Sequence, residues 1–243
     1  MNKVYVVGMG PGREDQMTLQ ARKVLETCDV IVGYTVYVEL LKEFLPDKEY
    51  RTTPMKKEVD RCRMAFEEAQ NGRSVAMVCS GDAGVYGMAG LMLEIGAEYP
   101  DCRVEVIAGV TAALAGGAVL GAPLIHDFAV ISLSDLLTPW EKIEKRLRLA
   151  AEADLAICIY NPSSKKRVDY LYRACEILME VVEETRVCGL VEQIGRDGEY
   201  DEVMTLRELR DRKVNMFTTV FVGNSQTRII GGRMVTPRGY QIG

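Results

Sequence analysis

Short apolar runs alternate with longer amphipathic stretches through the first half of the chain. The apolar runs are typical of buried strands and cover residues 3–7, 29–32, 74–79 and 103–107. Between them the pattern predicts helices at 17–26, 55–70 and 88–98. The second of these helices places Val59, Cys62, Phe66 and Ala69 on one face, and Asp15 is the expected cap of the first. Strands that alternate with helices indicate a mainly parallel sheet with right-handed crossovers.

The second half of the chain has a different pattern of predicted strands and helices. A small-residue helix runs to Leu120, and residues 121–123 (GAP) then break the chain, so we expect two α/β domains, 1–120 and 121–243. Further strands are predicted at 128–133, 154–160, 186–192 and 215–222, with a long helix across 168–182. Capping boxes at Thr138–Glu141 and Thr205–Glu208 mark two more helix starts.

Composition narrows the class of protein. The 243 residues carry a formal charge of −5 without a basic tract, which argues against a nucleic-acid partner. No apolar run approaches the length of a membrane span and no signal-peptide pattern is present, so a cytoplasmic protein without a membrane partner is expected. The seven cysteines include no Cys-x-x-Cys pair and there is one histidine, which predicts reduced core thiols and no metal site.

Residues 80–87 (SGDAGVYG) follow the buried strand 74–79 and carry three glycines and Asp82. Open α/β sheets bind ligands at such strand ends, and glycine lets the backbone approach a ligand closely. The competing interpretation is a tight turn in which Asp82 caps the next helix. Both interpretations stay open at this point.

The first turn, residues 8–12 (GMGPG), does not fit a dinucleotide site. The fingerprint requires a third glycine where Arg13 stands, and Pro11 removes an N–H that would contact phosphate. The turn therefore favours a ligand without a pyrophosphate. A serine hydrolase is also disfavoured, because the chain has no Gly-x-Ser-x-Gly elbow.

Four motifs together resemble the tetrapyrrole (precorrin) methylases, which use S-adenosylmethionine. They are residues 7–12 (VGMGPG), 80–87 (SGDAGVYG), 109–113 (GVTAA) and 160–164 (YNPSS). Residues 121–128 (GAPLIHDF) and 131–140 (ISLSDLLTPW) are similar to the cobalamin-synthesis branch that methylates carbon 17 of a precorrin-3-type tetrapyrrole and contracts its ring. The resemblance covers essentially the whole chain and implies two α/β domains with the cofactor in the cleft between them.

The resemblance also implies roles for individual residues. The residues expected to hold S-adenosylmethionine are Pro11, Gly81, Asp82, Val85, Thr111, Ala112, Asn161 and Ile194, with Pro11 also facing the tetrapyrrole. Ring contraction needs proton transfers, for which the candidates are His126, Asp127, Ser132 and Asp135. The basic candidates for the carboxylates of the substrate are Arg13, Lys56, Lys57, Lys165, Lys166, Arg167 and Arg228. A homodimer is implied, and whether the tetrapyrrole contains cobalt is left open.

Three alternatives compete with this interpretation. A diphthine-forming or ribosomal-RNA ribose methylase would share the fold, but the acidic balance argues against RNA. A nicotinamide-dependent oxidoreductase is disfavoured by Arg13 in the broken fingerprint. A non-catalytic nucleotide-binding module is the third.

Overall fold

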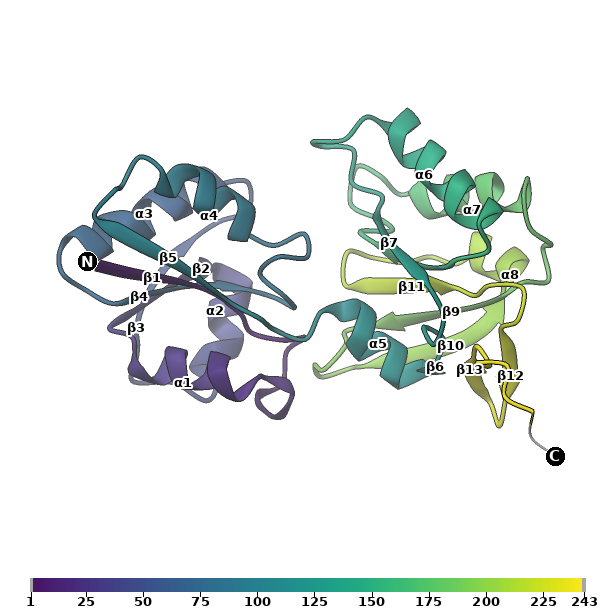
Figure 1. Ribbon diagram of the computed structural model, residues 1–243, viewed down its shortest axis with the longest axis horizontal. Coiled ribbons are helices and arrows are strands. Elements are labelled where there is room, and N and C mark those ends of the chain that lie inside the picture. The colour runs from purple at the N-terminus through teal and green to yellow at the C-terminus, as the bar shows by residue number, and fades with distance from the viewer. Residues whose placement is uncertain (1, 242–243) are drawn as a thin grey trace. The chain divides into compact units, whose positions relative to one another are not determined.

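The computed structural model describes residues 2–241, so Met1, Ile242 and Gly243, at the ends of the two expected domains, lie outside the described residues. The chain divides into two compact units, Met1–Ala112 and Ala113–Gly243 (Figure 1). The sequence placed this boundary at residue 120 instead. The difference is helix α5 (Ala112–Leu120), whose Gly116 lies against Ile194 and Phe221 and which therefore belongs with the second unit.

The first unit is built on one five-stranded sheet in the order β3-β2-β4-β1-β5. All its strand pairs are parallel, which confirms the predicted α/β class with a mainly parallel first sheet. The strands are β1 (Asn2–Gly8), β2 (Val30–Tyr34), β3 (Glu49–Thr53), β4 (Val75–Cys79) and β5 (Cys102–Ile107). The helices are α1 (Leu19–Thr27), α2 (Thr35–Lys42), α3 (Glu58–Gln70) and α4 (Ala89–Gly96), preceded by a short 3₁₀ turn, Glu14–Gln16.

Helices cover both faces of this sheet (Figure 1). On one face α3 and α4 pack Phe66 and Met92 against Val6 and Met77. On the other face α1 and α2 enclose a second core that includes Leu25. Because both faces are buried, the strands read as continuous apolar runs and not as alternating ones.

The second unit has a mixed five-stranded sheet in the order β10-β9-β11-β8-β7. Its strands are β7 (Phe128–Ser132), β8 (Ala156–Tyr160), β9 (Val187–Glu192), β10 (Tyr200–Thr205) and β11 (Thr218–Val222). The helices α6 (Trp140–Glu152), α7 (Tyr170–Met179) and α8 (Leu206–Arg210) contribute to its main core. A small separate sheet joins β6 (Gly121–Ala122), β12 (Arg228–Ile230) and β13 (Arg233–Val235).

Strand direction in this sheet decides which side chains share an edge. β7 pairs in parallel with β8, whereas β11 is antiparallel to both β8 and β9. β7, β8 and β9 therefore run in the same direction, and their carboxyl ends lie at one edge of the sheet.

Several helix starts differ from the sequence prediction. Thr18, not Asp15, caps α1, because its hydroxyl accepts a hydrogen bond from the N–H of Ala21, while Asp15 pairs with Arg13. Helix α6 starts after Pro139 without a side-chain cap, so the predicted capping box at Thr138 is wrong. The second predicted box is confirmed, since Thr205 and Glu208 make both reciprocal bonds.

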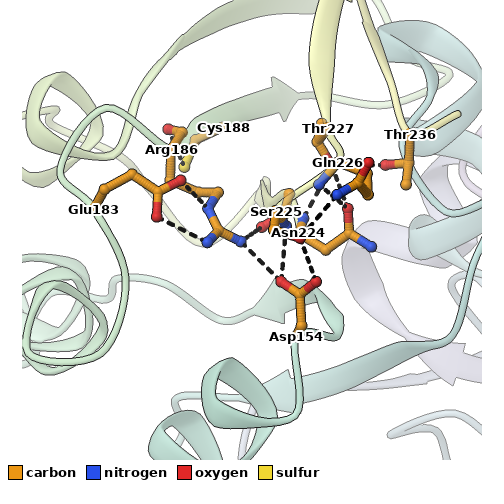
Figure 2. A network of polar contacts seen from close by, with 10 residues as sticks. Asp154, Glu183, Arg186, Cys188, Asn224, Ser225, Gln226, Thr227 and Thr236 are labelled. Atoms are coloured by element: carbon orange, nitrogen blue, oxygen red, sulfur yellow. Dashed lines mark hydrogen bonds and ion pairs between the residues drawn. The ribbon is translucent and has the colours of Figure 1, made fainter.

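A polar network joins loops at the opposite, amino edge of β8 and β9 (Figure 2). The buried Arg186 donates to both carboxylate oxygens of Glu183 and to Asp154, which also accepts bonds from the N–H and hydroxyl of Ser225. The Arg186 hydrogen bond lowers the pKa of Glu183. Burial alone would raise the pKa of Asp154, but the bonds from Ser225 and Arg186 outweigh it and lower the pKa. The buried guanidinium is thus fully compensated by carboxylates.

Within residues 2–241, no helix has the length and apolar character needed to cross a bilayer. The same residues contain no cluster of three or more histidine, cysteine or acidic side chains placed to hold a metal ion. Six of the seven cysteines are buried free thiols and Cys102 is half-buried. Burial raises the pKa of Cys62 to about 12, so this thiol is protonated at neutral pH.

Candidate active site

The glycine-rich turns of the first unit meet at the carboxyl edge of its sheet. They follow β4, β1 and β5, which are adjacent in the strand order. The N–H of Gly10 donates to the carbonyl of Gly81 at 3.1 Å, and the N–H of Gly81 donates to the carbonyl of Gly10 at 2.8 Å. Gly10 and Gly81 have φ of +78° and +68°, which favours glycine at both positions. We call the meeting of Gly8, Gly81 and Gly109 the glycine junction.

Close contacts between backbones explain why glycine occupies the other two positions of the junction, 8 and 109. A Cβ atom on Gly109 would lie 2.2 Å from the carbonyl oxygen of Gly81, and one on Gly8 would lie 2.7 Å from the same atom. Real Cβ contacts are longer, so neither site accepts a side chain unless the backbone moves. From the sequence, we interpreted the glycines of these turns as allowing the backbone to approach a ligand closely. The structure adds that the turns need glycine in order to pack on each other.

Asp82 ties two of these turns together. Its Oδ1 accepts a hydrogen bond from the N–H of Gly84 at 2.7 Å, and its Oδ2 accepts one from the N–H of Gly109 at 2.9 Å. Helix α4 begins after Met88 without a side-chain cap, so the interpretation of Asp82 as helix cap is wrong. A carboxylate offers about four acceptor positions, and these two bonds leave the others for donors of a ligand.

The other residues predicted to hold the cofactor in this unit lie near the junction. The Cβ position of Gly81 is 3.6 Å from the Cα of Thr111 and 3.7 Å from the nitrogen of Ala112. Pro11 is buried next to Gly10, and Val85 is half-buried in the turn that contains Asp82. The structure therefore gathers all six predicted residues of the first unit at one sheet edge.

The carboxyl edge of the second sheet gathers another group. Asn161 follows β8 with a φ of +53°, and its side-chain amide donates to the hydroxyl of Ser132 at the end of β7, at 2.9 Å. Tyr160, one residue earlier, accepts a hydrogen bond from the N–H of Ala113 at 2.7 Å. Ile194 follows β9 and is buried against Gly116 of α5. Ser132 and Asn161 are thus brought together, whereas Ile194 is a packing residue in this unit.

Asp135 lies in the loop after β7 and anchors a cluster of side chains. Its carboxylate accepts a hydrogen bond from the hydroxyl of Tyr170 at 2.6 Å and pairs with Arg167. The bond from Tyr170, followed by that from Arg167, lowers the pKa of Asp135, so the group is an anion at neutral pH. Tyr170 packs against Trp140, with ring centroids 4.6 Å apart, and the Arg173 guanidinium lies 4.1 Å from the centre of the Trp140 ring.

His126 and Asp127 are not brought to this edge. They precede β7, and the main-chain carbonyl of Asp127 accepts a bond from the N–H of Ala156 at the start of β8. The five residues of β7, at about 3.3 Å each, separate them from Ser132 by roughly 16 Å. His126 bonds through Nε2 to the carbonyl of Pro237 at 3.0 Å. Two of the four residues predicted for proton transfer therefore lie at the amino edge.

Sequence reasoning missed Arg61 at the carboxyl edge of the first sheet, and it assigned Tyr160 no role of its own beyond its place in the motif 160–164. Tyr160 is the last residue of a predicted strand, which was an available signal. Arg61 is buried, whereas Val59, predicted on the apolar face of the same helix, is 47% exposed. The spacing of Arg61 from Ala65 and Ala69, at four and eight residues, was the signal that it shares their buried face.

Comparison with known proteins identifies the family of this chain. A family model described as Tetrapyrrole (Corrin/Porphyrin) Methylases matches residues 3–210. The chain therefore belongs to the tetrapyrrole methylases, which confirms the predicted resemblance to a family of methyltransferases.

Particular relatives narrow the similarity further. The chain is 45% identical to a probable cobalt-factor III C(17)-methyltransferase of Salmonella typhimurium, over 98% of this chain and 99% of the relative. It is 40% identical to a precorrin-3B C(17)-methyltransferase of Sinorhizobium sp, over 93% and 91% of the two chains. The crystal structure of the methyltransferase CobJ superposes with a TM-score of 0.90 at 39% identity, covering 98% of this chain and 100% of that one.

Proposed function

We propose that this protein is an S-adenosylmethionine-dependent methyltransferase that methylates carbon 17 of a precorrin-3-type tetrapyrrole in cobalamin biosynthesis, with contraction of the ring. The observation that carries the proposal is the 45% identity, over nearly the full length of both chains, to a relative named for this methylation. That identity is higher than the 40% to the precorrin-3B relative, which favours a cobalt-containing substrate.

The residues of the first unit fit S-adenosylmethionine. The glycine junction packs the backbones of three turns together at one edge, and Asp82 in one of these turns retains acceptor positions for hydroxyl or ammonium donors. Pro11 and Arg13 disfavour a pyrophosphate, which S-adenosylmethionine lacks. The residues of this unit that would hold S-adenosylmethionine are Gly81, Asp82, Val85, Thr111 and Ala112. When bound, it supplies a methyl group already activated by a sulfonium.

Positioning is the main task left to the chain. Aligning two reactants contributes roughly 7–11 kcal/mol to lowering a barrier, and this does not require a catalytic dyad. Of the four residues predicted for proton transfer, we favour Ser132, because Asn161 fixes its hydroxyl at the carboxyl edge. Asp135, held as an anion by Tyr170 and Arg167, would orient its loop and not act as an acid. We also propose a cytoplasmic homodimer.

Binding of S-adenosylmethionine and NAD to the same protein tests the cofactor class. Isothermal titration is expected to show saturable binding of S-adenosylmethionine and no heat of binding with NAD, because the first turn lacks the third glycine at Arg13. S-adenosylhomocysteine, which keeps every group except the methyl, serves as the control and should compete. Binding of NAD without binding of S-adenosylmethionine would favour the oxidoreductase alternative.

A further inference from the structure

Arg61 is an arginine buried at the carboxyl edge of the first sheet. It lies in the first turn of α3 and only 5% of its surface is exposed. Its Nε donates to the hydroxyl of Thr53 at 2.8 Å and its Nη2 donates to the carbonyl of Pro54 at 3.2 Å. The ring of Tyr34 lies 5.8 Å from the guanidinium carbon. Thr53 and Tyr34 are the last residues of β3 and β2, so the guanidinium lies where these two strands end.

The charge of Arg61 has no counter-charge among residues 2–241. Its contacts with Thr53, Pro54 and Tyr34 are all with neutral groups, and no carboxylate of the described chain lies within ion-pair distance. Arg186, the other buried arginine, is paired with both Glu183 and Asp154. Burying a charge without an opposite partner is costly, so a protein retains such a residue where something else compensates it.

Arg61 also keeps unused donors. A guanidinium has five N–H groups, and the two bonds to Thr53 and Pro54 use two of them. Among the described residues the one fully enclosed side-chain nitrogen or oxygen without a partner is Oε1 of Gln16. The free Nη1 of Arg61 therefore reaches solvent, although the residue as a whole is buried.

The unused donors of Arg61 lie at the same edge of the first sheet as the glycine junction. Cys79 ends β4 and immediately precedes the turn that contains Asp82. Burial is the main cause that raises the pKa of the Cys79 thiol to about 11, and the Arg61 charge acts against it. The charge of Arg61 is thus felt at the strand end from which the ligand turn departs.

We propose that Arg61 binds a carboxylate of a ligand at the carboxyl edge of the first sheet. The inference rests on the proposed function, which provides two sources of carboxylate: the acidic side chains of the tetrapyrrole and the methionyl end of S-adenosylmethionine. A planar guanidinium with adjacent N–H groups matches a carboxylate through paired hydrogen bonds. The bound carboxylate supplies the missing counter-charge.

The test compares Arg61→Met, which removes the charge, with Arg61→Lys, which keeps the charge and loses the fork. Arg63→Met is the control, because Arg63 lies on the same helix, is exposed and pairs with Glu98. Two measurements are made: calorimetry gives the Kd of S-adenosylmethionine, and steady-state kinetics at saturating S-adenosylmethionine give the KM and kcat for the tetrapyrrole. Thermal unfolding identifies variants that remain folded.

We expect Arg61→Met to raise either the Kd of S-adenosylmethionine or the KM for the tetrapyrrole about 10- to 100-fold. This is the range for a lost charge-assisted hydrogen bond. Arg61→Lys should recover part of this loss, and Arg63→Met should stay within about twofold of wild type. A rise in KM alone assigns the carboxylate to the tetrapyrrole, and a rise in Kd assigns it to S-adenosylmethionine.

Folded Arg61 variants in which neither constant changes would overturn the inference and leave Arg61 as a link between β3 and α3. A wild-type protein that neither binds S-adenosylmethionine nor transfers a methyl group would overturn the proposed function, and this inference with it.

Discussion

Replacing Gly109 with alanine is expected to lower the rate of methyl transfer about 100-fold, the effect of displacing a positioned reactant by about 1 Å. The new Cβ would lie 2.2 Å from the carbonyl oxygen of Gly81 and 2.5 Å from that of Gly8. Both atoms are backbone, so the turns must separate. Overpacking of this kind also destabilises proteins by about 1–3 kcal/mol. Single-turnover kinetics and urea unfolding measure the two effects.

Gly90→Ala is the matched control for this substitution. Gly90 lies in α4 with no atom within 4 Å of its Cβ position. Alanine there should stabilise the helix by roughly 0.5–1 kcal/mol and leave the methyl-transfer rate unchanged. If Gly109→Ala also kept the wild-type rate, the junction would not position the reactants.

Replacing Asp82 with alanine is expected to weaken binding of S-adenosylmethionine about 100-fold. The substitution removes the acceptors for the N–H groups of Gly84 and Gly109, and each charge-assisted bond contributes about 1.5–3 kcal/mol. It also removes the acceptor positions left for the ligand. Asp82→Asn should weaken binding of S-adenosylmethionine about tenfold, because the amide oxygen of asparagine can replace only one carboxylate oxygen. Calorimetric titration measures both affinities.

Asp101→Ala provides the comparison in the same unit. Asp101 is exposed and precedes β5, so it lies at the opposite edge of the same sheet. The affinity of the Asp101→Ala variant for S-adenosylmethionine should equal that of the wild-type protein. Wild-type affinity in Asp82→Ala would show that the turn at Asp82 does not hold the cofactor.

The strands with both faces buried were predictable because they are continuous apolar runs. β1, β4 and β8 all lie within or close to their predicted ranges. β3 was missed because it is an edge strand whose sequence, EYRTT, is mostly polar, with only Thr53 buried. The hairpin of β12 and β13 was missed because each strand has only three residues and most of their side chains are exposed. Edge strands are held by backbone bonds on one side, which leave little trace in side-chain pattern.

The site was predictable as a set of motifs but not as a set of contacts. Asp82 bonds to Gly109, 27 residues further along the chain, and no local pattern connects the two. The buried charge of Arg61 contradicts the local rule that arginine faces solvent, so helical spacing was its one signal. His126 and Asp127 could have been placed from the sequence alone. They precede the predicted strand 128–133, whereas α/β sheets bind ligands at the carboxyl ends of strands.

Transfer of a labelled methyl group tests the central claim most directly. The protein is incubated with S-adenosylmethionine carrying a ¹³C methyl and with either a cobalt-containing or a metal-free precorrin-3-type tetrapyrrole. The product is then examined by mass spectrometry and carbon NMR. The proposed function predicts one labelled methyl on carbon 17 of a ring-contracted product, formed faster from the cobalt-containing substrate. Absence of the label from both products, or a label on another carbon, would contradict it.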